Sequence, residues 1–147
     1  MMRTREQIAG LSLREKMIFL RTCTTAFAVD AMNLLGLKRW WLDGLKPIKQ
    51  GQIMVAPAST FCLERLRRRE PVRNAYDALE VCNEGTVMCI ANIHDTFLIG
   101  GNVVTFAWNK GIAGVVIEAC NRDVREIRKL DIPVYSQGVG ARVVDPD

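Results

Sequence analysis

Residues 111–127 of the chain read GIAGVVIEACNRDVREI, and this stretch decides the fold class. Its strand-like part, Gly114–Glu118, is a short apolar run rich in β-branched residues, which is typical of a buried strand. The segment that follows, Asp123–Leu130, places its charged residues on one side, which predicts a helix. A strand that leads directly into a helix is the building unit of an α/β domain.

The same alternation extends in both directions from this stretch. Upstream, Thr86–Ala91 predicts another buried strand, and a helix is expected to open at Gly100 and run to about Lys110. Downstream, Pro133–Ser136 predicts a third strand. The order strand, helix, strand, helix, strand indicates a mixed or parallel sheet flanked by helices.

The first third of the chain predicts helices. Ser12 and Glu15 have the spacing of a capping box, and Thr24 can cap a second helix. A short strand is expected at Gln52–Ala56, directly before a proline. Because neither a repeat nor a linker is recognisable, we expect a single domain over residues 1–147, with an N-terminal helical part at 1–50 and an α/β core at 51–147.

The composition is that of a globular domain: of 147 residues, 49% are hydrophobic and 24% are charged. The uncharged stretches Gln50–Leu63 and Thr96–Asn109 are shorter than the roughly 20 residues of a membrane-spanning helix. The start of the sequence lacks the apolar core of a signal peptide. The five cysteines include no C-x-x-C pair, which suits a reducing compartment. We therefore expect a cytoplasmic protein without membrane association.

Positive charge is concentrated in the first half of the chain. The balance of charged residues is +8 up to Arg73 and −4 after it, giving a net charge of +4. This asymmetry, with the run Arg65–Arg69, is compatible with RNA binding, but solvated loop charge is the default interpretation of the run. Nucleic-acid binding is not expected, and a field that steers anionic substrates is the alternative role.

Two segments can carry chemistry, because ligands of α/β domains bind beyond the carboxyl ends of parallel strands. In the first, Gly100 and Gly101 lead into a helix whose free amides, at Asn102 and Val103, form an anion site. A plain strand-to-helix turn is the structural alternative. In the second, Arg122 and Asp123 follow a buried strand. Arginine can bind a carboxylate and aspartate a divalent metal, although a helix cap beside a solvated arginine is again the alternative.

Residues 111–127, with Ile132-Pro133-Val134-Tyr135 after them, resemble a family signature that reads roughly G-x-x-G-x-V-I-D-G/A-x-x-R-D, then a helix, then F/I-P-V-[FW]. This RraA-like family contains the 4-hydroxy-4-methyl-2-oxoglutarate and 4-carboxy-4-hydroxy-2-oxoadipate aldolases and the regulators of ribonuclease activity A. Upstream, Thr24–Gly36 resembles its T-x-x-x-x-D-A-[LM] helix, and Ala56–Thr60 its G-x-A-x-T strand end. The resemblance implies a swivelling α/β/α architecture and a homo-oligomer, either a trimer or a hexamer.

The resemblance also implies an activity. The family's aldolases depend on Mg²⁺ or Mn²⁺ and also decarboxylate oxaloacetate. Carried over by position, Arg122 binds the pyruvyl carbonyl and stabilises the enolate, while Asp123 holds the metal. The turn at Gly100 and Gly101, with the amides of Asn102 and Val103, grips the substrate carboxylate. The implied function is a metal-dependent lyase that cleaves a 4-hydroxy-2-oxo di- or tricarboxylic acid to pyruvate.

The chain departs from the aldolase pattern in places. Gly101 stands where those aldolases usually carry an acidic residue, and Glu118 where they carry Asp. Many of them continue past the position of Asp147 with a segment whose acidic residue completes the metal surroundings of a neighbouring subunit. We therefore expect weak metal binding, or an activity that is lost or changed. The alternatives are a non-catalytic regulator that binds a ribonuclease or another protein, and a family member recruited to other carbanion or enolate chemistry. The regulators typically lack the Asp of the Arg-Asp pair, so Asp123 favours an enzyme.

Three further features have a functional and a structural interpretation. His94 can act as an acid or base near pH 7, or it is a polar loop residue bonded to Asp95. Trp40 and Trp41 form either a partner surface or a packed pair. Cys120, directly before Asn121-Arg122, is either a reactive thiol or a small buried side chain.

Overall fold

The computed structural model describes residues 4–38, 41–63, 75–92 and 98–141. The contacts divide the chain into two compact units, Met1–Leu42 and Asp43–Asp147. The prediction that residues 1–147 form a single domain stays a prediction.

The first unit contains three helices, α1 (Arg5–Ala9), α2 (Leu13–Leu20) and α3 (Thr25–Leu34). Each begins at a residue whose side chain accepts a backbone N–H, namely Thr4, Ser12 and Thr24. At Ser12 the capping box is complete, because Glu15 Oε2 accepts from the Ser12 amide at 2.9 Å. The expected caps at Ser12 and Thr24 are confirmed.

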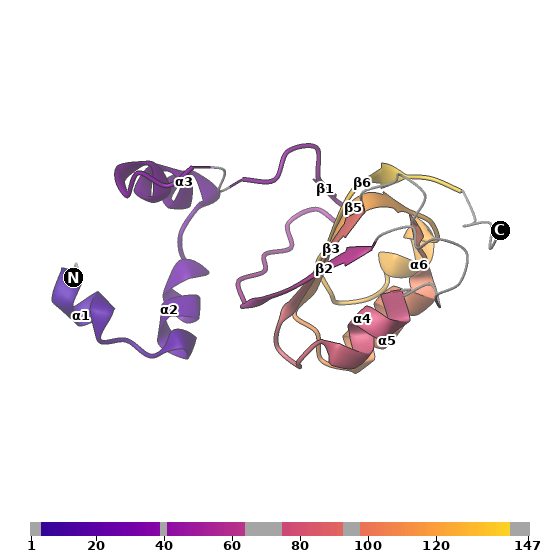
Figure 1. The fold of residues 1–147 in the computed structure, drawn as a ribbon, viewed down its shortest axis with the longest axis horizontal. Coiled ribbons are helices and arrows are strands. Elements are labelled where there is room, and N and C mark those ends of the chain that lie inside the picture. The colour runs from indigo at the N-terminus through magenta and orange to yellow at the C-terminus, as the bar shows by residue number, and fades with distance from the viewer. Residues whose placement is uncertain (1–3, 39–40, 64–74, 93–97, 142–147) are drawn as a thin grey trace. The chain divides into compact units, whose positions relative to one another are not determined.

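The second unit is a mixed sheet with helices (Figure 1). The strands follow the order β1-β6-β5-β3-β2, with β4 also beside β5. All pairings are parallel except that of β1 with β6. The strands are β1 (Lys46–Pro47), β2 (Ala58–Leu63), β3 (Val87–Asn92), β4 (Leu98–Ile99), β5 (Gly114–Asn121) and β6 (Val134–Val139), and the helices are α4 (Ala75–Val81), α5 (Gly101–Asn109) and α6 (Val124–Ile127). The predicted α/β fold class is confirmed.

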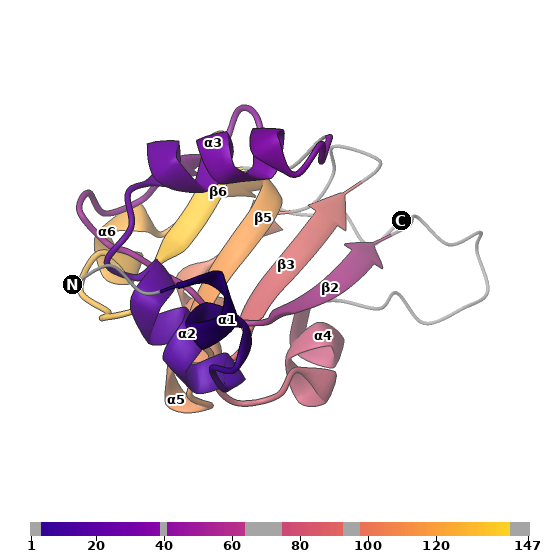
Figure 2. The same cartoon turned by 90° about the vertical axis from the view of Figure 1, so that its left-hand side faces the viewer.

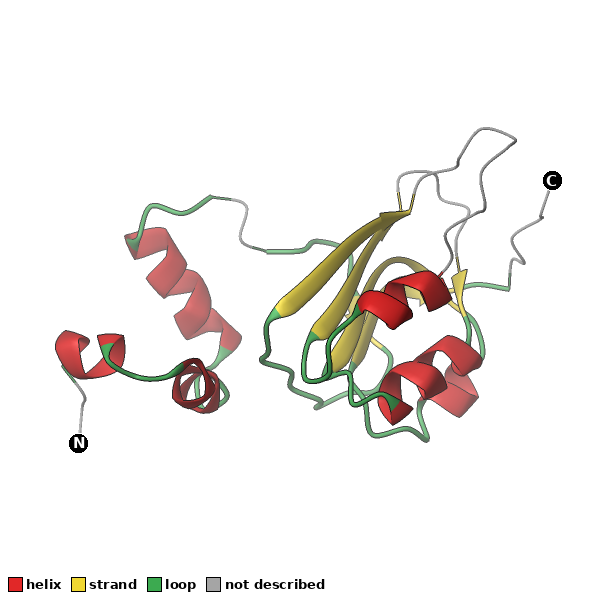
Figure 3. Cartoon of the chain, turned by 60° about the horizontal axis from the view of Figure 1, so that its bottom comes forward, coloured by secondary structure: helices red, strands yellow, loops and turns green. Residues whose placement is uncertain are grey.

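The hydrophobic core of this unit lies between the sheet and its helices. Buried side chains of β3 and β5, such as Met88 and Ile117, belong to the same cluster as Leu79 of α4, Val104 of α5 and Ile127 of α6. Figures 2 and 3 show α4, α5 and the strands that they cover from two further directions. The core therefore fixes the start of α5 and the end of β5 against each other, and the site lies there.

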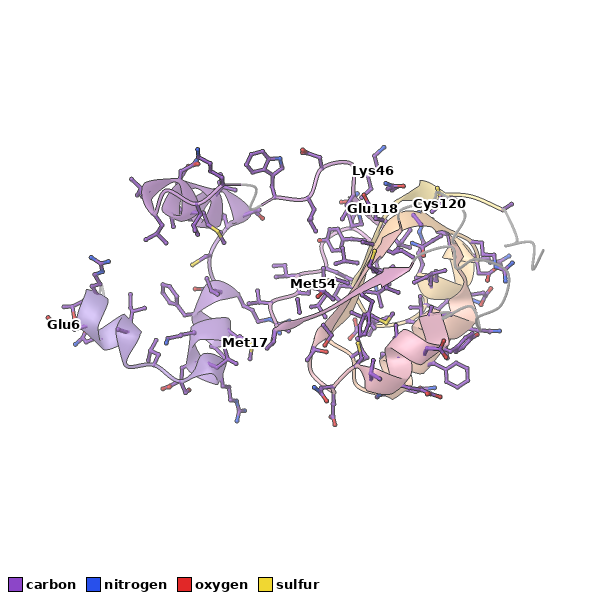
Figure 4. All side chains as sticks on the ribbon, in the orientation of Figure 1. Glu6, Met17, Lys46, Met54, Glu118 and Cys120 are labelled. Atoms are coloured by element: carbon purple, nitrogen blue, oxygen red, sulfur yellow. The ribbon has the colours of Figure 1, made fainter. Side chains whose placement is uncertain are left out.

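The expected strand at Gln52–Ala56 is wrong, because the strand of this region, β2, begins after Pro57. The apolar segment lies against other elements instead of pairing. Tyr135 Oη donates to the carbonyl oxygen of Gln52 at 3.2 Å. Met54, labelled in Figure 4, lies so close to Gly114 that a Cβ there would come within 2.5 Å of Met54 Sδ. A short apolar run does not by itself distinguish a strand from a covering segment.

The predicted elements around the key stretch exist, but their bounds differ. Strand β5 continues to Asn121, and helix α6 covers only Val124–Ile127. Asp123 has φ 58°, in the left-handed region, so it cannot be the first helical residue. After Ile127 the amides of Lys129 and Leu130 bond to carbonyls three residues back, which ends the α-helix in a tighter turn.

Candidate active site

The candidate site is built from two strand-to-helix turns that start from one pair of residues. In the parallel pairing of β4 with β5, Ile99 lies beside Asn121, and both are fully buried. Gly100 and Gly101 follow Ile99 and begin α5. Arg122 and Asp123 follow Asn121 and lead into α6. The structure therefore brings together the two segments that the sequence singled out separately.

Asp123 connects the two turns. Its Oδ2 accepts a hydrogen bond from the Gly101 amide at 3.0 Å, although 22 positions separate the two residues. The same side chain makes no capping bond to its own helix α6. Asp123 thus caps α5, the neighbouring helix, and does so from a left-handed backbone conformation. The structural alternative from the sequence was that Asp123 caps the helix that follows it, and the structure shows no such bond to α6.

Gly100 and Gly101 allow this close approach because they lack side chains. A Cβ at Gly100 would lie 2.8 Å from Asp123 Oδ2 and 3.1 Å from Arg122 Nε. A Cβ at Gly101 would lie 3.3 Å from the Asp123 Cβ. The glycine pair thus allows close approach at a helix start, as expected, and the groups that approach are the protein's own Arg122 and Asp123.

Arg122 is anchored by its backbone while its guanidinium remains accessible. Its amide donates to the Ile99 carbonyl at 3.0 Å. Its Nε lies 3.8 Å from Asp123 Oδ2, and the two side chains are 45% and 49% exposed. A contact of this length in solvent is weak. The guanidinium is therefore free to bind a carboxylate or a carbonyl oxygen of a ligand.

Two amides in the first turn of α5 complete the positive side of the site. The Gly101 amide is bound by Asp123, and the first bond within the helix runs from the Val104 amide to the Gly100 carbonyl at 3.4 Å. The amides of Asn102 and Val103 have no acceptor among the described residues. Free amides at the start of a helix attract anions. The amides left free to donate to an anion are therefore those of Asn102 and Val103, the two expected from the sequence.

Asp123 is the one carboxylate of these turns that suits a metal. Its Oδ1 makes no hydrogen bond to any described residue. Glu126 is nearby, but its Oε2 pairs with Lys129 Nζ at 2.5 Å. Across the described ranges there is no cluster of three or more His, Cys, Asp or Glu able to hold a metal. Mg²⁺ is often held by one or two carboxylates plus water and substrate, so Asp123 fits such an open site and not a closed protein cage.

Of the other candidate residues from the sequence, some lie outside the described residues and the cysteines lie within them. His94, Trp40 and the run Arg65–Arg69 lie outside the described residues. Cys120 is half-buried, and its Sγ would be 3.9 Å from a Cβ at Gly138. Burial, with a smaller contribution from Cys82, raises the pKa of the Cys89 thiol, which makes Cys89 less reactive.

Sequence reasoning missed Asn121. It is one of two buried polar side chains among the described residues, and both its amide nitrogen and its amide oxygen lack a hydrogen-bond partner. The available signal was its position, since a polar residue closes an apolar strand directly before Arg122 and Asp123.

With this geometry established, comparison with known proteins identifies the family. Residues 25–146 match the family model described as RraA-like, Aldolase/RraA. The chain belongs to this family. Streptomyces coelicolor RraAS2, described as an unusual member of the RNase ES inhibitor RraA protein family, has a similar structure, with a TM-score of 0.77 at 25% sequence identity over 90% of this chain and 67% of that one.

Two curated relatives match this RraA-like chain over part of their own length. Protein DlpA of Legionella pneumophila is 28% identical over 120 residues, which are 80% of this chain but only 19% of DlpA. The 4-hydroxy-4-methyl-2-oxoglutarate aldolase of Thermus thermophilus is 49% identical over 37 residues, or 25% of this chain and 23% of the aldolase. The match to this RraA-like chain therefore covers about a fifth of DlpA and about a quarter of the aldolase.

Within the described ranges, none of the helices combines the length and the apolar character that crossing a bilayer requires.

Proposed function

We propose that this RraA-like chain is a divalent-metal-dependent lyase that cleaves a 4-hydroxy-2-oxo di- or tricarboxylic acid to pyruvate and decarboxylates oxaloacetate. The observation that carries the proposal is the bond from Gly101 to Asp123. It places a carboxylate, a half-exposed arginine and two free helix amides around one end of the sheet. This combination suits a substrate with a 2-oxo acid group and a metal-dependent reaction.

Each residue has a separate role in the proposed reaction. The amides of Asn102 and Val103 donate to the carboxylate beside the 2-oxo group. Arg122 donates to the 2-oxo oxygen. Asp123 holds Mg²⁺ or Mn²⁺, which when bound supplies positive charge that polarises the substrate oxygens. The proposed site thus surrounds the part of the substrate that becomes pyruvate.

The cleavage follows a retro-aldol course. A base takes the proton of the 4-hydroxyl group, and the bond between C3 and C4 breaks. C4 becomes the carbonyl carbon of the second product, and the electron pair of the broken bond forms the enolate of pyruvate. Arg122 stabilises the negative charge on the enolate oxygen, and a proton added to carbon completes pyruvate. Oxaloacetate requires the same enolate, with carbon dioxide as the second product.

Pyruvate release measured with purified protein tests the proposal. We expect Mg²⁺- or Mn²⁺-dependent pyruvate release from 4-hydroxy-4-methyl-2-oxoglutarate or oxaloacetate. Arg122→Ala should reduce it by about 100-fold or more, because an electrostatic partner of the enolate is lost. Arg125→Ala is the matched control, since Arg125 is an exposed arginine of α6, and it should retain activity. Absence of metal-dependent release from every such acid would exclude the lyase.

A regulator is the second candidate function. It is favoured by the printed description of the Streptomyces relative as a member of an RNase inhibitor family, and by Gly101 in place of an acidic residue. This candidate predicts a protein partner, such as a ribonuclease, whose binding is independent of metal and survives Arg122→Ala.

The oligomeric state is a separate prediction. Light scattering after size-exclusion chromatography checks the predicted trimer or hexamer. The cytoplasmic location also stays a prediction.

A further inference from the structure

The side chain of Asn121 is unusual among the buried polar groups of this structure. Asn121 and Ser136 are the buried polar side chains of the described residues, both with no exposed surface. Ser136 Oγ donates to the Gly138 carbonyl at 3.2 Å. The Asn121 Nδ2 and Oδ1 atoms have no partner. Most buried polar atoms in proteins are paired, so an unpaired carboxamide is a feature that requires an explanation.

The backbone of Asn121 is bonded normally, so only its side chain is unusual. Its carbonyl oxygen accepts from the Gly140 amide at 2.9 Å, and the residue pairs with Ile99 of β4 and Val139 of β6. Residues paired across parallel strands point to the same face of the sheet. Asn121 therefore shares a face with Ile99, a member of the core cluster, and lies just before the turn that starts α5.

The candidate partner for this side chain is the Gly101 amide, in the turn that starts α5. The Gly101 amide, two residues after Ile99, now donates to Asp123 Oδ2. A metal ion that drew Asp123 Oδ2 out of this bond would leave the amide without its acceptor. An unused acceptor at this end of β5 is Asn121 Oδ1, on the residue paired with Ile99. Asn121 thus has an acceptor without a donor, and a metal ion that takes Asp123 Oδ2 would leave the Gly101 amide as a donor without an acceptor.

We propose that Asn121 is a positioning residue of the site, whose Oδ1 accepts the Gly101 N–H when a divalent cation and an anionic ligand draw Asp123 away. In the free protein the unpaired carboxamide disfavours the folded state, and in the occupied protein its hydrogen bond keeps α5 capped. Asn121 then links stability to ligand binding without touching the ligand. The inference rests on the proposed function.

Thermal unfolding with Mg²⁺ and oxalate tests this inference without measuring activity. Replacing the unpaired carboxamide by an apolar group of similar shape, in Asn121→Leu, should raise the Tm of the free protein by roughly 3 °C. The rise in Tm that Mg²⁺ and oxalate produce should fall to less than half of the wild-type rise. Ser136→Ala is the matched control, because it loses a satisfied hydrogen bond. It should lower the free Tm and keep the full ligand-induced rise.

The outcomes separate the two proposals. An equal ligand-induced rise in wild type and Asn121→Leu would overturn the role of Asn121 and leave the lyase intact. No rise in the wild-type protein, together with no lyase activity, would overturn both.

The second measurement does not depend on whether Asn121→Leu folds. In ¹⁵N-labelled wild-type protein, the backbone amide of Gly101 and the side-chain amide of Asn121 should both shift when Mg²⁺ and oxalate are added. The side-chain amide of the exposed Asn109 should not shift. An Asn121 signal that stays in place while the Gly101 signal moves would contradict the proposed switch.

Discussion

The β4–α5 and β5–α6 turns both carry the chain from a strand into a helix, yet they cap their helices differently. At the β4–α5 turn the cap residue is Gly100, which has no side chain to offer, and the helix amide of Gly101 is bonded by Asp123 from the other turn. At the β5–α6 turn Asp123 holds the cap position but leaves its own helix uncapped. One aspartate therefore serves the neighbouring helix, and a change in either turn reaches both.

The sharpest way to separate the two uses of Asp123 is Asp123→Asn. Asparagine tolerates the left-handed conformation and still accepts from the Gly101 amide, so the free energy of unfolding should change by less than about 0.5 kcal/mol. Its neutral amide is a poor metal ligand, and we expect metal-dependent pyruvate release to fall by about 100-fold or more. Chemical denaturation and the pyruvate assay measure the two effects.

Asp123→Ala is the matched comparison. Alanine lacks the acceptor and fits the left-handed conformation poorly, so stability should fall by about 2 kcal/mol along with activity. If Asp123→Asn destabilises the protein as much as Asp123→Ala does, the cross-turn cap is not what holds the two turns together.

Gly100→Ala tests the comparison from the other turn. Its Cβ would come within 2.8 Å of Asp123 Oδ2, so the aspartate has to turn away from α5. We expect a loss of about 1 kcal/mol in unfolding free energy, the usual value of an N-terminal cap. Because that cap is already missing in Asp123→Ala, adding Gly100→Ala to this variant should cost much less. Fully additive losses in the double variant would contradict a shared interaction.

Gly101→Ala should have the smallest effect. Its Cβ would meet the Asp123 Cβ at 3.3 Å, which is tight, while alanine favours a helical backbone over glycine. These contributions oppose each other, and we expect a change within about 0.5 kcal/mol. Thermal unfolding of the variant provides the check, and a loss as large as that of Gly100→Ala would show that the turn has less room than the structure indicates.

Much of this architecture was predictable from the sequence because its causes are local. The capping box at Ser12 depends on residues three positions apart, and β3, β5 and β6 follow from short apolar runs near glycine or proline. The two-residue strand β4 left no recognisable pattern. The run at Gln52–Ala56 was misleading, because the apolar character that suits a strand equally suits Met54 covering Gly114.

The sequence by itself determined which residues are available for chemistry: the glycine pair at 100 and 101, the Arg-Asp pair at 122 and 123, and the signature that resembles the RraA-like family. Only the tertiary structure decided what these residues do to one another. The bond from Gly101 to Asp123 joins positions 22 apart, and the burial of Asn121 depends on the strands beside it. Such long-range contacts arise because the core sets β4 and β5 side by side, and no local pattern in the sequence encodes that placement.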